Sequence, residues 1–129
     1  MTPAPARRQR GTAARRAGRR AEWIAALLLM AKGYRILGMR LRTPQAEIDL
    51  AAVRGKVLAI VEVKQRRTLE EALLAVTPRQ RERLRRAGRA LAAREGAKAQ
   101  AVVRLDIVAL APGRWPRHIA DAWSDAGLR

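Results

Sequence analysis

Several residue types that build common functional sites are missing or scarce in this chain. It contains no cysteine and no phenylalanine, one histidine, one tyrosine and three tryptophans. Without cysteine there are no disulfides, no thiolate metal sites and no cysteine nucleophile. The shortage of aromatic side chains argues against an RNA-recognition sheet, which stacks bases on aromatic rings. There is also no glycine-rich phosphate loop and no nucleophilic serine motif.

Acidic residues are scarce as well, which gives the chain a large positive charge. There are 28 Lys and Arg residues against 11 Asp and Glu residues, for a formal net charge of +17 on 129 residues. Such a charge repels itself unless a polyanion neutralises it, so nucleic acid is the first partner to expect and an anionic membrane surface the second. The length corresponds to one domain.

The N-terminal region predicts a basic arm followed by a buried helix. The first twenty residues carry seven arginines and no acid, so we expect a disordered arm over residues 1–13 and a single domain over residues 14–129. The apolar run Trp23–Ala31 has the length of an export-signal core, which leaves an exported or membrane-surface protein as an alternative. Glu22 and Lys32 flank the run directly, and it is shorter than the ~20 residues of a membrane span. We therefore expect a cytoplasmic protein.

Hydrophobic periodicity and capping residues predict an α/β fold. Gly33 is typical of a helix C-terminal cap, and Thr77 with Gln80 is typical of a capping box. The expected elements are a helix over Ala14–Lys32, strands over Tyr34–Arg42, Glu47–Val53 and Lys56–Lys64, a helix from Pro78 to about Glu95, a strand over Ala101–Leu110 and a short extended segment over Arg117–Trp123. The apolar face of the first helix is expected to consist of Ile24, Leu27, Leu28 and Ala31. The order αβββαβ indicates a mixed sheet flanked by helices.

The third expected strand ends in two charges, although its apolar residues suggest burial on both faces. At period two, Glu62 and Lys64 share one face, so the carboxylate and the ammonium lie side by side. A two-residue turn at Arg54-Gly55 would place Asp49 opposite Ile60. Asp49 and Glu62 would then be diagonal neighbours, close enough for two carboxylates to share one cation. A three-residue loop would break this register.

Two acids and a lysine at one point of a sheet suit phosphodiester hydrolysis. Carboxylates bind Mg²⁺ (or Mn²⁺) through oxygen, the metal polarises a phosphoryl group and activates water, and a lysine steadies the developing negative charge. The simpler alternative is a contact between Glu62 and Lys64 at a sheet edge, with Asp49 facing solvent.

Three segments carry a resemblance to a known family: a helix that begins Ala21-Glu22, the motif Glu47-Ile48-Asp49-Leu50, and the motif Val61-Glu62-Val63-Lys64. This pattern resembles the YraN-like family of uncharacterised bacterial proteins, which belongs with the PD-(D/E)-x-K restriction-endonuclease-like nucleases. By that similarity Asp49 and Glu62 would be the main metal ligands and Lys64 the catalytic lysine. Glu22 would reach the metal from the first helix.

The spacing of these motifs is also similar to that of the archaeal Holliday junction resolvases of the same fold. That similarity implies branched or otherwise structured DNA as the substrate, and a two-fold homodimer would suit a symmetric junction. Three features depart from the YraN-like pattern, which usually has Gly where this chain has Ala46 and Lys where it has Gln80. The Gly that usually follows the Lys-x-Arg block is missing from Thr68 to Ala72.

Arginines near these motifs are candidates for contact with nucleic acid. Arg66 and Arg67 follow the lysine directly and are placed to hold a phosphate, or else they belong to an ordinary solvated loop. Arg81 and Arg85 belong to a strongly basic face of the helix after Pro78, which suits contact with a DNA backbone.

Two further polar residues are expected to be structural. Asp106 lies between apolar residues of a strand, so we expect it to pair inside the fold, with an arginine as the partner. His118 is the one histidine, and no second imidazole exists to build a zinc site with it. Two functions remain open: a Mg²⁺-dependent DNA endonuclease, and a non-catalytic nucleic-acid-binding module on the same fold.

Overall fold

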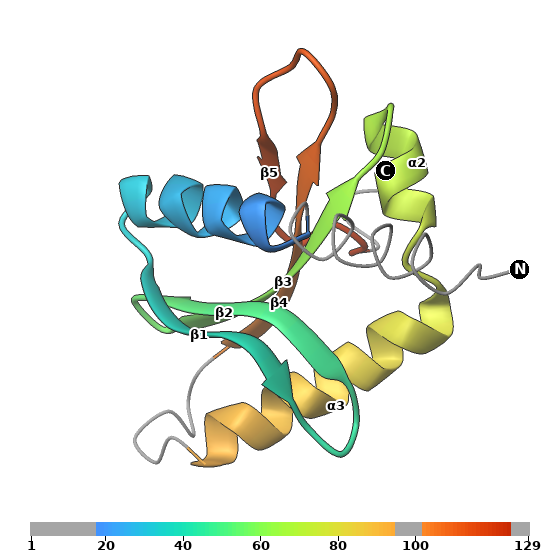
Figure 1. Cartoon of the computed structure of the whole chain (residues 1–129). Helices are drawn as coiled ribbons and strands as arrows, with labels where there is room; N and C mark the ends of the chain where they lie inside the picture. The colour runs from blue at the N-terminus through green and yellow to red at the C-terminus, as the bar shows by residue number, and fades with distance from the viewer. Residues whose placement is uncertain (1–17, 95–101, 125–129) are drawn as a thin grey trace, which may run out of the picture.

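A computed structural model describes residues 18–94 and 102–124 of the chain (Figure 1). A helix over residues 18–31 is followed by β1 (Arg35–Arg42), β2 (Glu47–Arg54), β3 (Val57–Gln65), α2 (Leu69–Leu74), α3 (Pro78–Arg94), β4 (Val102–Leu110) and β5 (Arg117–Ile119). The predicted arm and the predicted start of the first helix at Ala14 lie outside the described residues. So do the predicted end of the helix from Pro78, at Glu95, and the predicted start of the following strand, at Ala101.

The strands form one sheet in the order β1-β2-β3-β4-β5. Only the central pair, β3 and β4, is parallel, and α2 and α3 form the crossover between these two strands. The other three pairs are antiparallel. The predicted α/β class, with a mixed sheet flanked by helices, is confirmed.

Each face of the sheet packs against a different helix. Leu84, Ala87 and Leu91 of α3 pack in one buried cluster with residues of β2, β3 and β4. Ala25 and Leu29 of the first helix belong to a second cluster on the same strands. In Figure 1 these two helices lie on opposite sides of the sheet. Helix α3 therefore buries one apolar stripe, and β3 is buried from both sides as expected.

The first helix turns a different face to the sheet from the one predicted. Its most buried residues include Ala21, Ala25 and Leu29, spaced at i, i+4 and i+8, whereas Leu27 is 60% exposed. Alanine leaves little side chain between helix and sheet, so the helix presents its small residues at the closest approach. The predicted cap is confirmed, because Gly33 has a φ of 92° and the Tyr34 backbone N–H donates to the Leu29 carbonyl oxygen at 3.0 Å.

No helix within residues 18–94 and 102–124 is long and apolar enough to cross a membrane.

The hairpin between β2 and β3 has a different register from the one predicted. Arg54 pairs with Val57, so the two loop residues are Gly55 and Lys56 rather than Arg54 and Gly55. Gly55 has a positive φ of 60°, and the first central position of a type II′ hairpin loop favours glycine for this reason. The register continues to Leu50↔Val61, so the next residues along, Asp49 and Glu62, are directly opposite rather than diagonal.

Asp106 is fully buried and pairs inside the fold, as predicted. Arg104 holds both carboxylate oxygens, with its Nε and Nη2 atoms each at 2.8 Å. His118 donates from Nε2 at 2.8 Å, and the Asp121 backbone N–H donates at 3.0 Å. The Lys32 ammonium, which can only donate, lies 2.9 Å from Nδ1 of His118. His118 therefore carries its proton on Nε2 and links the end of the first helix to β4 and β5.

The last predicted extended segment is shorter than expected. β5 ends at Ile119, and Asp121 takes a positive φ of 52° so that its N–H reaches Asp106. Trp123 then folds against α2, with its indole N–H donating to the Leu73 carbonyl oxygen at 3.1 Å.

Candidate active site

Asp49 and Glu62 lie on adjacent strands with their carboxylates close to the backbone of β3. The Val63 N–H donates to Oδ2 of Asp49 at 3.0 Å, which fixes this carboxylate beside the strand that carries Glu62. Nζ of Lys64 lies 3.5 Å from Oε2 of Glu62, so the predicted side-by-side arrangement of these two charges is confirmed. The side chains of Glu62 and Lys64 are only 12% and 23% exposed, so their charges interact through a medium less polar than water.

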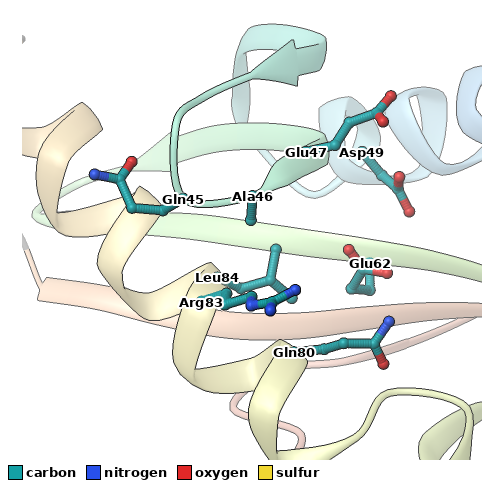
Figure 2. A pocket seen from close by; sticks show the side chains of 8 residues that line it. All are labelled: Gln45, Ala46, Glu47, Asp49, Glu62, Gln80, Arg83 and Leu84. Carbon is teal, nitrogen blue, oxygen red and sulfur yellow. The ribbon is translucent and has the colours of Figure 1, made fainter.

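The two carboxylates line a pocket of about 330 Å³ between the sheet and α3 (Figure 2). Figure 2 shows Glu47, Asp49 and Glu62 on one side of this space, with Gln80 and Arg83 of α3 across from Glu62. Gln80 and Arg83 are three residues apart and so lie on one face of the helix. The lining consists of Gln45, Ala46, Glu47, Asp49, Glu62, Gln80, Arg83 and Leu84.

Glu22 lies near this pair but is bound to another partner. Its Oε1 atom accepts from Nε of Arg40 at 2.5 Å. Arg40 has a positive φ of 52°, a conformation that costs a non-glycine residue about 1–3 kcal/mol and is concentrated at functional sites. The strand register sets Arg40 beside Asp49, between the pairs Met39↔Leu50 and Leu41↔Ile48. The predicted ligand Glu22 thus lies close enough to Asp49 to raise its pKa, and its carboxylate is paired with Arg40.

The electrostatics of the pair favour a bound cation. Burial is the main cause that raises the pKa of Asp49, and the charges of Glu22 and Glu47 raise it further. Burial and the neighbouring Asp49 carboxylate raise the pKa of Glu62 to about 7, against an ordinary value of 4.5. Lys64 opposes both shifts without cancelling either. A cation between the carboxylates would remove this repulsion.

The donor set fits Mg²⁺ or Mn²⁺ through two protein carboxylates rather than three. Within the described residues, no three Asp, Glu or His side chains come close enough together to hold a metal ion by themselves. Mg²⁺ is commonly held by one or two carboxylates, with waters and substrate phosphates as its other ligands. Asp49 and Glu62 can supply the two carboxylates, and Glu22 could join them only after leaving Arg40.

We expect Glu62→Gln to stabilise the protein at neutral and alkaline pH when EDTA has removed divalent cations. The raised pKa means that folding favours the neutral carboxyl, so the wild type loses stability as pH rises from about 4.5 towards 7. Glutamine lacks this cost, and the gain in unfolding free energy should be on the order of 1–2 kcal/mol above pH 7. Urea unfolding at pH 4.5 and pH 8 measures it.

Glu70→Gln is the matched control, because Glu70 is exposed on α2. It should leave stability unchanged at both values of pH. An equal stability of Glu62→Gln and wild type at pH 8 would contradict the buried repulsion between the carboxylates.

The arginines predicted to bind nucleic acid occupy two kinds of place. Arg66 and Arg67 are exposed at the end of β3, and both line a hollow beside the loop between β4 and β5. Arg81 is half-buried, with its guanidinium 5.8 Å above the ring of Trp123. Arg85 is half-buried as well. Arg83, which is not among the predicted nucleic-acid-binding residues, lines the carboxylate pocket instead.

The chain was also compared with known proteins. Residues 21–110 match the model of the uncharacterised protein family UPF0102. A UPF0102 protein of Caulobacter vibrioides is 68% identical over 93% of this chain and 96% of its own length. A UPF0102 protein of Parvibaculum lavamentivorans is 51% identical over 88% of this chain and 85% of its own length. One of Methylorubrum extorquens is 47% identical over 96% of this chain and 95% of its own length. The family match covers Glu22, Asp49, Glu62 and Lys64, and the chain therefore belongs to the uncharacterised protein family UPF0102.

Proposed function

We propose that this protein is a metal-dependent endonuclease that hydrolyses phosphodiester bonds of DNA. The observation that carries the proposal is the cluster of Asp49, Glu62 and Lys64, whose two carboxylates line a pocket that Arg83 also lines. The resemblance to PD-(D/E)-x-K nucleases assigns the same chemistry to the same positions. The net charge of +17 supports a polyanionic substrate.

Each residue of the cluster has a distinct task in this proposal. Asp49 and Glu62 would hold Mg²⁺, which supplies polarisation of the phosphoryl group and activation of water. The Val63 N–H keeps Asp49 oriented towards β3 before substrate arrives. The Lys64 ammonium donates to the negatively charged oxygens that develop as the phosphodiester is attacked.

Helix α3 provides the surface on which the DNA backbone would approach. Arg83 lies in the pocket, and its position lets the guanidinium hold a phosphate next to the scissile one. Other exposed arginines of the same helix are Arg79, Arg86, Arg89 and Arg94. Contacts of this kind neutralise phosphates without distinguishing bases, so we propose binding by backbone and shape rather than by sequence.

One observation favours a second candidate, a non-catalytic nucleic-acid-binding module. The contact between Arg40 and Glu22 satisfies a carboxylate that the nuclease pattern assigns to the metal. If this contact persisted with DNA bound, Glu22 would serve only the structure, and any metal would depend on Asp49 and Glu62 alone. The two candidates differ in whether DNA is cut.

The test is cleavage of labelled DNA by the purified full chain. Duplex, single-stranded, flap and four-way-junction DNA are each incubated with Mg²⁺, with Mn²⁺ and with EDTA, and binding is followed in parallel. The proposal predicts cleavage of at least one form with metal and none with EDTA. Asp49→Asn excludes a contaminating nuclease, because it should abolish cleavage and keep or tighten binding by removing a charge that repels phosphate. Tight, salt-sensitive binding without cleavage of any form would instead establish the binding module.

A further inference from the structure

Trp115 is the most exposed of the large apolar side chains in the described residues. It is 89% exposed and lies in the loop between β4 and β5. Figure 1 shows this loop extending beyond the end of the sheet. By contrast, Trp123 packs inside and makes a hydrogen bond with the Leu73 carbonyl. Leaving an indole in water without a packing partner forgoes the burial that usually stabilises it.

Two hollows flank Trp115, and arginines line both. The larger has a volume of about 640 Å³ and lies between the loop, the end of β3 and Ile24 of the first helix. The smaller, of about 140 Å³, lies towards the start of α2. Trp115, Arg67 and Arg114 line both hollows, and no acidic residue of the described chain lines either one. The surface therefore combines an exposed aromatic ring with concentrated positive charge.

This surface adjoins the carboxylate site through β3 itself. Arg66 lies two residues beyond Lys64, which is about 7 Å along an extended strand. The Arg66 N–H donates to the Leu110 carbonyl at 3.0 Å, so the base of the loop is fixed to the end of β3. A nucleic-acid strand advances about 3.4 Å per nucleotide. The Trp115 surface thus begins about two nucleotides from a phosphate held at Lys64.

The ligand that matches an exposed indole surrounded by arginines is a nucleotide with an unpaired base. The ring can stack on a base, and the arginines can hold the phosphates on either side of it. In a continuous duplex both faces of each base are already stacked on neighbouring bases, so the ring has no face to contact. A base at a flap, gap or branch point does offer one.

We propose that Trp115 stacks on an unpaired base two or more nucleotides from the scissile phosphate, and that Arg66, Arg67 and Arg114 hold the adjoining phosphates. This inference rests on the proposed function and narrows its substrate to DNA with a single-stranded segment beside the cleavage site.

The test measures binding without cleavage. The full-length Asp49→Asn chain in EDTA is titrated into three labelled DNAs: a continuous duplex, the same duplex with a single-stranded flap, and the free single strand. Adding Trp115→Ala should weaken binding to the flap and the single strand by about ten-fold or more, and binding to the continuous duplex by less than about two-fold. Trp115→Phe, which retains a ring for stacking, should keep most of the affinity.

Trp23→Ala is the matched control, because Trp23 is another exposed tryptophan and does not line either hollow. It should bind all three DNAs as the parent chain does. Arg114→Gln should weaken binding to all three DNAs by the same factor and reduce the salt dependence of binding. If Trp115→Ala weakened binding to the flap and to the continuous duplex equally, the stacking role would be overturned. If it weakened binding to none of the DNAs, the stacking role would also be overturned, and the exposed ring would point to a protein partner. Because no step of this test requires cleavage, failure of the nuclease proposal leaves its result interpretable.

Discussion

Replacing Lys64 with methionine is expected to lower the single-turnover rate of DNA cleavage by about 10²–10³-fold, the usual effect of removing one group that stabilises transition-state charge. Methionine keeps the length of the aliphatic stem and removes the charged ammonium group, so the packing around β3 is preserved. The affinity for DNA should change little, because Lys64 is one of 28 basic residues and its side chain is only 23% exposed. Rapid-quench cleavage and anisotropy titrations measure the two effects separately.

Lys56→Met makes the same chemical change at the opposite end of β3. Lys56 is exposed in the hairpin loop, remote from the carboxylates, and the variant should cleave at the wild-type rate. Lys64→Arg is expected to recover only part of the activity, because a planar guanidinium cannot reproduce the compact charge of the ammonium. Wild-type cleavage by Lys64→Met would remove Lys64 from the mechanism.

Asp106→Ala is expected to lower the free energy of unfolding by about 3–5 kcal/mol, as is typical when one partner of a buried ion pair is removed. The carboxylate is fully buried and accepts hydrogen bonds from Arg104, His118 and the Asp121 backbone. Without it, the Arg104 guanidinium and the His118 N–H lose their main acceptor. Small domains have only about 5–15 kcal/mol of stability, so urea unfolding should show a large shift of the midpoint.

The difference in unfolding free energy between wild type and Asp106→Ala should depend on pH in a definite direction. Burial alone would raise the pKa of Asp106, but the hydrogen bonds from His118 and Arg104 outweigh it and hold the pKa below 3.8. A carboxyl whose pKa is lower in the folded chain than in the unfolded chain contributes stability at any pH above its ordinary pKa. This stability is lost as pH falls through the lower pKa of the folded chain. The gap between wild type and Asp106→Ala should therefore be constant near neutrality and shrink only in acid. Glu70→Ala, at an exposed site on α2, is the control, and a loss below about 1 kcal/mol from Asp106→Ala would contradict the buried role.

The long, periodic elements of this fold could be predicted from sequence because their signals are local. β2, β3 and α3 begin and end within one or two residues of the predicted bounds where the structure describes those ends. The capping box that opens α3 is present, with the Thr77 N–H donating to Oε1 of Gln80 at 2.8 Å. Helix α2 was missed because six residues are too few to show a helical period. A local signal did exist, since the Thr68 hydroxyl accepts from the Glu71 N–H as an N-cap.

Two errors concern packing, which local signals do not specify. The hairpin loop could be placed at Arg54-Gly55 or at Gly55-Lys56, and each choice leaves every side chain on the same face of its strand. The alternation of apolar residues therefore could not decide between them. In the first helix, the periodicity predicts large apolar residues in the core, although the sheet packs against alanines there. That preference follows from the distance between helix and sheet, which depends on both partners.

The candidate site could be predicted in part. The positions of Glu62 and Lys64 follow from the two-residue period of a strand, so their proximity was accessible from sequence. The contact between Glu22 and Arg40 was not, because it depends on an unusual backbone conformation in β1. The position of Arg83 in the pocket could not be predicted, because it depends on how α3 packs on the sheet. In the same way, the scarcity of aromatic residues does not indicate that one of them, Trp115, is 89% exposed.

The most direct test of the central claim, that Asp49 and Glu62 share a divalent cation, is the effect of Mg²⁺ on unfolding free energy at pH 7.5 and constant ionic strength. A site that binds only the folded chain adds about 1.4 kcal/mol when Mg²⁺ is at ten times its dissociation constant. The wild type should gain this stability, whereas Asp49→Asn and Glu62→Gln should start more stable without metal and gain little from it. An equal response to Mg²⁺ in the wild type and both variants, or no response in any of them, would contradict the claim.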